Sequence, residues 1–81
     1  MENQTAYVEV DARDRGVLYI YDRMIRAYCR IKDIPITVKV NRDGLVVNGQ
    51  VPLSTLEKLA ESAFTPRRNV RSYDIKLEDR K

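Results

Sequence analysis

The feature that most constrains the fold is a hairpin signal in the middle of the chain. Residues 34–40 alternate between apolar and polar side chains, and residues 45–51 follow as a return strand with Leu45, Val47 and Val51 inward. Between them stands Asp43-Gly44, a pair that tolerates the positive φ angles of tight hairpin turns. We therefore expect two neighbouring antiparallel strands here. The strand with Pro35 should lie at a sheet edge, because proline cannot donate to the ladder.

An amphipathic helix is expected on each side of this hairpin. Over residues 17–32 apolar side chains recur at three- and four-residue steps, which is the period of a helix with one buried face. Over residues 54–64 the same spacing returns. Ser54 and Glu57 have the spacing of a capping box at its start, and Pro66 disfavours helical geometry just beyond its end.

Two further strands are expected near the ends of the chain, over residues 6–10 and 70–77, where apolar and polar residues alternate. The order of strand, helix, strand, strand, helix, strand predicts an α+β two-layer sandwich. This is a ferredoxin-like βαββαβ fold with two helices on one face of a four-stranded antiparallel sheet. We expect one domain over residues 1–81, with 1–5 and 78–81 frayed. The predicted core consists of Met24, Tyr28, Val38, Val47, Leu56, Leu59, Phe64 and Ile75.

Residue composition argues against most enzymatic chemistry. The chain has no histidine and one cysteine, so Ser-His and Cys-His nucleophile pairs and a structural zinc site are not expected. Its three glycines match neither a phosphate loop nor a dinucleotide fingerprint. We therefore expect no catalytic residue, no metal and no cofactor, and we expect Cys29 to be a small buried hydrophobe. An acid or base supplied by tyrosine, lysine or glutamate stays open.

The sequence predicts a cytoplasmic location. The first residues are polar and include an acid, unlike the basic start and apolar run of a secretory signal. The longest apolar run, residues 17–21, is far too short to span a membrane. A lone cysteine also fits a reducing compartment.

Arginines form two groups that suggest an anionic partner. The formal net charge is +3, from 15 basic and 12 acidic residues, which favours anionic partners only slightly. One group lies at steps of three and four on the first predicted helix, and the other lies at the start of the last strand. The planar arginine fork suits phosphate, and contacts of this kind tolerate any base sequence. The predicted anion-binding or nucleic-acid-binding residues are Arg23, Arg26, Arg30, Arg67, Arg68 and Arg71.

A solvated surface is the alternative interpretation of both arginine groups. Asp22 stands four residues before Arg26, so the two side chains can form an ion pair on the helix surface.

The spacing of the central segments resembles that of a known class of module. Residues 36–40 are followed by Gly44-Leu45-Val46, by residues 49–51 and, 19 residues after Val51, by Val70. This spacing resembles that of BON-type and ring-building modules of bacterial envelope proteins and secretion rings. The resemblance implies an interaction module that packs against copies of itself or against membrane surfaces.

Three functional hypotheses follow from these observations. The first is a small non-enzymatic regulatory or accessory protein that binds nucleic acid or another polyanion through its arginines. The second is a protein-interaction module that self-associates through its sheet edges, as a homodimer formed along the last strand. The third is a ferredoxin-like endoribonuclease. Anion binding requires unpaired arginines on one surface, whereas assembly requires an exposed edge or apolar patch.

Overall fold

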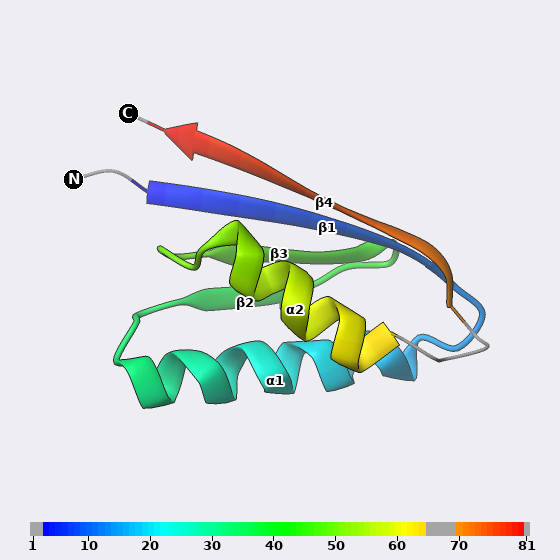
Figure 1. The fold of residues 1–81 in the computed structure, drawn as a ribbon. Helices are drawn as coiled ribbons and strands as arrows, with labels where there is room; N and C mark the ends of the chain where they lie inside the picture. The colour runs from blue at the N-terminus through cyan, green and yellow to red at the C-terminus, as the bar shows by residue number, and fades with distance from the viewer. Residues whose placement is uncertain (1–2, 65–69, 81) are drawn as a thin grey trace.

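The elements follow one another in the predicted order. The computed structural model describes residues 3–64 and 70–80, and within these it contains β1 (Asn3–Ala12), α1 (Gly16–Lys32), β2 (Thr37–Val40), β3 (Gly44–Asn48), α2 (Leu53–Phe64) and β4 (Val70–Arg80). Figure 1 shows the two helices on one side of the sheet. The chain therefore has the predicted ferredoxin-like α+β fold, a two-layer βαββαβ sandwich.

The strands lie in the order β2-β3-β1-β4, and all neighbours are antiparallel. The first strand of the chain is thus an inner strand, with β3 on one side and β4 on the other. The edges of the described sheet are β2, which follows Pro35, and β4, which lies along the top of Figure 1. Both edges agree with the sequence prediction.

Gly44 is required by the close approach of β1 and β3. A Cβ atom on Gly44 would lie 1.8 Å from the carbonyl oxygen of Val8, a distance at which the two strands would have to separate. The turn signal in the sequence predicts a positive φ at this glycine. Among the described residues φ is positive only at Asp33 (58°) and Gly49 (152°). The absent side chain, and not an unusual backbone angle, therefore explains Gly44.

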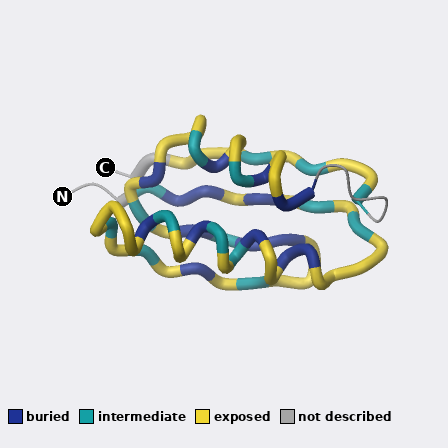
Figure 2. Tube along the Cα trace, turned by 60° about the horizontal axis from the view of Figure 1, so that its bottom comes forward, coloured by how far each residue is buried: buried dark blue, intermediate teal, exposed yellow. Residues whose placement is uncertain are grey.

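The core lies between the helices and the sheet, where Figure 2 shows the buried segments facing one another. At its centre the Tyr21 hydroxyl of α1 donates to the carbonyl oxygen of Leu56 in α2, at 2.9 Å. The Tyr21 ring lies 5.0 Å from the ring of Phe64, and Phe64 lies 5.1 Å from the ring of Tyr73 in β4. Three aromatic rings thus join both helices to an edge strand.

The predicted core is half right. Four of its members are buried, namely Val38, Val47, Leu56 and Phe64. The other four are only partly buried and pack against that core, namely Met24, Tyr28, Leu59 and Ile75. Three of these lie on the two helices, and Ile75 lies on an edge strand that has a neighbour on one side only.

The ends of the sheet and the start of α2 also differ from expectation. Residues 3–5 and 78–80 do not fray, because Asn3 pairs with Arg80 at the far end of β1 and β4. The helix α2 begins at Leu53, so Ser54 lies inside its first turn and not at a capping box. The carbonyl oxygen of Pro52 instead accepts hydrogen bonds from the backbone amides of Thr55 and Leu56.

Replacing Leu56 by alanine is expected to lower the free energy of unfolding by about 2–5 kcal/mol, because the fully buried side chain would leave a cavity. Leu53→Ala, on the same helix but 37% exposed, is the matched control and should cost less than about 1 kcal/mol. Urea unfolding followed by circular dichroism measures both values. Equal costs would contradict the position of Leu56 in the core.

Candidate functional site

Two of the predicted arginines stand free on the outer face of α1. The buried residues of this helix include Tyr21, Ile25 and Cys29, so Arg23 and Arg30 lie on the opposite side, and both are exposed. Being seven residues apart, they are separated by about two turns, or about 10 Å along the helix axis. Within the described residues neither side chain forms a hydrogen bond or an ion pair. These two side chains are therefore available to a ligand.

Arg26 differs from Arg23 and Arg30, because its side chain forms hydrogen bonds that link α1 to the sheet. Its Nε donates to Asp22 Oδ1 at 2.7 Å, and its Nη2 donates to the carbonyl oxygen of Val38 in β2 at 3.2 Å. The predicted pair of Asp22 and Arg26 is thus present. Arg26 is better described as a structural residue than as a ligand-binding one.

Arg71, the described member of the second arginine group, lies apart from the first group. Arg71 is exposed at the start of β4, which is one edge of the sheet, whereas α1 packs against β2 and β3 near the other edge. A register shift at Asp11/Ala12 leaves Arg71 without a directly opposite residue in β1. Arg67 and Arg68 lie outside the described residues. Among the four described arginines, the structure therefore places Arg71 apart from the three on α1.

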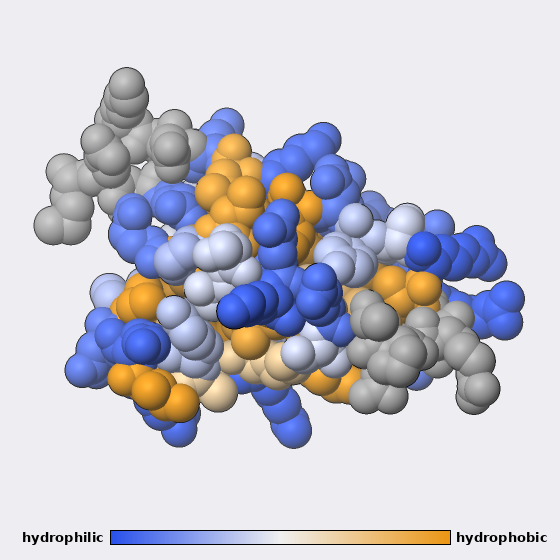
Figure 3. All heavy atoms as spheres, in the orientation of Figure 1, coloured by the Kyte–Doolittle hydropathy of each residue, from blue (hydrophilic) through white to orange (hydrophobic). Residues whose placement is uncertain are grey.

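The surface around α1 mixes charged and apolar side chains. Tyr19 and Ile20 in its first half and Ile31 in its last turn are exposed, Ile31 by 80%. In Figure 3 hydrophilic side chains dominate the visible face, and apolar side chains reach it in separate places. The candidate anion-binding face is thus small and flanked by apolar groups.

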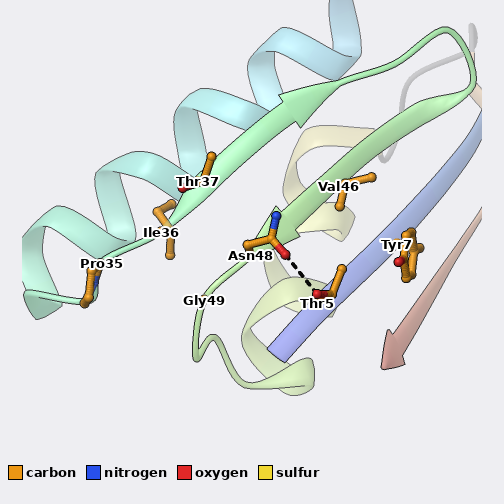
Figure 4. A pocket seen from close by; sticks show the side chains of 8 residues that line it. All are labelled: Thr5, Tyr7, Pro35, Ile36, Thr37, Val46, Asn48 and Gly49. Atoms are coloured by element: carbon orange, nitrogen blue, oxygen red, sulfur yellow. Dashed lines mark hydrogen bonds between the residues drawn. The ribbon is translucent and has the colours of Figure 1, made fainter. Parts of the chain in front are cut away.

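A shallow hollow on the open face of the sheet is uncharged. It has a volume of about 610 Å³ and is lined by Thr5, Tyr7, Pro35, Ile36, Thr37, Val46, Asn48 and Gly49 (Figure 4). The Thr5 hydroxyl donates to Asn48 Oδ1 at 2.8 Å across its floor. The Tyr7 hydroxyl donates to Glu78 Oε1 at 3.1 Å. No carboxylate or cationic side chain lines the hollow, so it offers an anion no opposite charge.

An acidic group on the open face was not predicted. Glu9, Asp11, Asp43 and Asp74 line a second hollow of about 420 Å³. Glu9 and Asp74 lie directly opposite each other in β1 and β4. Only the strand order brings them together, since they are far apart in the sequence. Within the described ranges no three acidic or cysteine side chains are placed to hold a metal ion.

The buried titratable groups have structural positions. Burial raises the pKa of the Tyr21 phenol, and nearby Tyr73 and Glu57 add to the effect. Burial also raises the pKa of the Cys29 thiol, which is 1% exposed as the sequence predicted. Both groups stay uncharged at neutral pH. Neither therefore provides the activated nucleophile or base that a reaction needs.

The chain is thus a small ferredoxin-like domain with two free arginines on one helix and an open sheet edge. No known protein family matches it, and no curated protein does. Among solved structures it is similar to the crystal structure of acylphosphatase from Bacillus subtilis, with 17% sequence identity and a TM-score of 0.46. That alignment covers 96% of this chain and 86% of the other. The resemblance to BON-type modules stays a prediction.

In the parts of the chain that the structure describes, neither helix is long and apolar enough to cross a membrane.

Replacing Arg26 by alanine is expected to lower the free energy of unfolding by about 1 kcal/mol, because both its ion pair and its bond to the Val38 carbonyl are lost. Arg23→Ala on the same helix removes the same charge and no bonded contact, and should change stability by less than about 0.5 kcal/mol. Urea unfolding distinguishes the two variants. A larger loss for Arg23→Ala would contradict the assignment of Arg26 as the structural arginine.

Proposed function

We propose that this chain is a small, cytoplasmic, non-enzymatic regulatory or accessory protein that binds nucleic acid or another polyanion through the outer face of α1. The supporting observation is the pair of exposed arginines, Arg23 and Arg30, which make no bond within the described residues. Each can offer phosphate a planar fork of donors. The buried, uncharged thiol of Cys29 is compatible with a reducing compartment.

The geometry sets the expected strength of this binding. Two free arginines neutralise at most two phosphates, which gives a slope of about 1.4 to 1.8 in a log–log plot of affinity against salt. Six arginines would give about three times that slope. One copy of the chain should therefore bind weakly, without base preference, and only at low salt.

The double variant Arg23→Ala/Arg30→Ala is expected to lose most binding to a labelled mixed-sequence oligonucleotide at low salt, with an unchanged unfolding curve. Fluorescence anisotropy at two salt concentrations, with single- and double-stranded probes, measures the affinity and its slope. The matched control is Lys39→Ala/Lys58→Ala, which removes the same charge from exposed positions outside α1. The control should bind like the parent after correction for net charge.

Two outcomes would contradict this proposal. Equal losses in both double variants would mean that net charge, and not the α1 face, governs binding. Cleavage of a single-stranded RNA version of the labelled oligonucleotide by the parent chain would overturn the non-enzymatic assignment and favour the endoribonuclease hypothesis.

A second candidate function is that of an interaction module that forms homodimers through a sheet edge. The observation that favours it is β4, an 11-residue strand with no proline and, in the described chain, no neighbour beyond it. A long exposed edge is a template for pairing with another strand. Leu77 on this strand is 38% exposed, although it points to the side of the helices.

The homodimer is expected to appear as a doubling of mass with rising concentration in multi-angle light scattering. Low salt is the best condition for this measurement, because surface charge pairs weaken as salt rises. A mass that stays at 9.4 kDa across the whole range would contradict this second function.

A further inference from the structure

The outer edge of β4 presents a defined set of backbone groups. In β1 the Gln4 carbonyl accepts from Gly49, and the Val10 amide donates to the Asp43 carbonyl, so even-numbered residues of this strand face β3. Odd-numbered residues of β1 must then face β4, where Tyr7 lies opposite Lys76. In β4 the amides and carbonyls of the even-numbered residues are therefore bonded to β1, inside the sheet.

The odd-numbered residues of β4 therefore direct their amides and carbonyls outward. Among them are Tyr73, Ile75 and Leu77, and Ile75 lies midway along β4 (Val70–Arg80). A second strand laid antiparallel on this edge would bond to these three residues. The even-numbered residues would then form the pairs without hydrogen bonds, in which side chains approach most closely.

We propose that a second copy of this chain pairs antiparallel along β4, with the two-fold axis at Ile75. Asp74 then lies opposite the partner's Lys76, and Lys76 lies opposite the partner's Asp74. This inference rests on the proposed homodimer and assigns its register. The two sheets join into one continuous sheet, with all helices on the same face.

Charge argues against the registers one residue away, and the length of the pairing argues against the register at Leu77. Residues directly opposite in a continuous sheet share a face, so the axis must pass through a residue and not between two residues. An axis at Asp74 places that carboxylate opposite itself, and an axis at Lys76 places two ammonium groups together. An axis at Leu77 pairs Lys76 with the partner's Glu78, but it engages only residues 74–80. The axis at Ile75 aligns opposite charges and uses the whole strand.

The charges around Asp74 in the single chain favour an interaction with a lysine of the partner. Asp74 lies directly opposite Glu9, an arrangement of like charges that destabilises a strand pair. Its own cation, Lys76, is 3.9 Å away, and both side chains are more than half exposed. In the dimer each Asp74 gains a second lysine, so four charges alternate in sign around the axis.

The helix side of the edge is apolar along β4 itself, with Glu57 and Glu61 of α2 beside it. With the axis at Ile75, the two Ile75 side chains meet, and Leu77 lies opposite the partner's Tyr73. Ile75 and Tyr73 are only partly covered in the single chain, and Leu77 is 38% exposed. Pairing would bury the apolar flank that the helices leave open on β4.

A charge exchange tests this register by sedimentation equilibrium at low salt. Asp74→Lys and Lys76→Asp each place like charges opposite one another twice, so each should weaken the dimer about tenfold or more. The double variant Asp74→Lys/Lys76→Asp restores opposite charges and should return the dimer to within about threefold of the parent. Glu78→Lys is the control: it makes the same charge change on the same face but would lie opposite the partner's Ser72, and should weaken the dimer by less than about threefold. Because it also removes the bond from the Tyr7 hydroxyl, its unfolding curve is measured beside that of the parent.

A cross-linking experiment gives a readout that does not depend on charge. Ser72 and the partner's Glu78 lie directly opposite in this register, at a position where side chains approach closely. A mixture of Ser72→Cys and Glu78→Cys chains should form a disulfide-linked heterodimer faster than either variant forms a homodimer. The native Cys29 is buried and should not interfere.

The outcomes separate the register from the homodimer itself. A monomeric parent would overturn both. A dimeric parent whose charge exchange is not restored in the double variant, or which Glu78→Lys weakens as much as Asp74→Lys, would overturn the axis at Ile75 alone. Preferential homodimer cross-linking of either cysteine variant would do the same.

Discussion

The buried phenol of Tyr21 is the contact on which both layers of the structure depend. Its hydroxyl satisfies the Leu56 carbonyl inside the core, and its ring begins the aromatic series that continues through Phe64 to Tyr73. A buried hydroxyl without a partner would cost free energy, so the two helices must keep one mutual position. Because Tyr73 belongs to β4, the same contact fixes the edge strand on which the proposed dimer is built.

Local patterns predicted the fold because each element carries its own signal. The alternation around Asp43-Gly44 defined the hairpin, and the three- and four-residue steps of residues 17–32 defined α1. What local patterns could not give was the effect of distant neighbours. The extension of β1 to Asn3 depends on a partner near the other end of the chain. The need for Gly44 depends on the carbonyl of Val8, and neither contact can be found from sequence spacing alone.

The candidate site was predicted only in part, for a similar reason. Arg23, Arg26 and Arg30 share a helix face by spacing, but Arg26 lies beside β2 and bonds to its backbone. That difference depends on how α1 is rotated against the sheet, which hydrophobic periodicity fixes only roughly. The acidic group of Glu9 and Asp74 depends on the order of the strands. Sequence reasoning found residue types and faces, whereas the structure decided which side chains are free.

The pairing of β1 with β4 has a consequence for the order in which the chain can fold. The inner strand β1 is synthesised before the other strands, but its neighbour β4 is synthesised last. Asn3 in β1 therefore waits for Arg80 in β4 before it can pair. Contacts of such long sequence separation slow folding. Until β4 has emerged from the ribosome, the side of β1 that it will occupy is an open edge. The β4 strand of another chain fits that edge equally well, so domain swapping is the misfolding route that this topology favours.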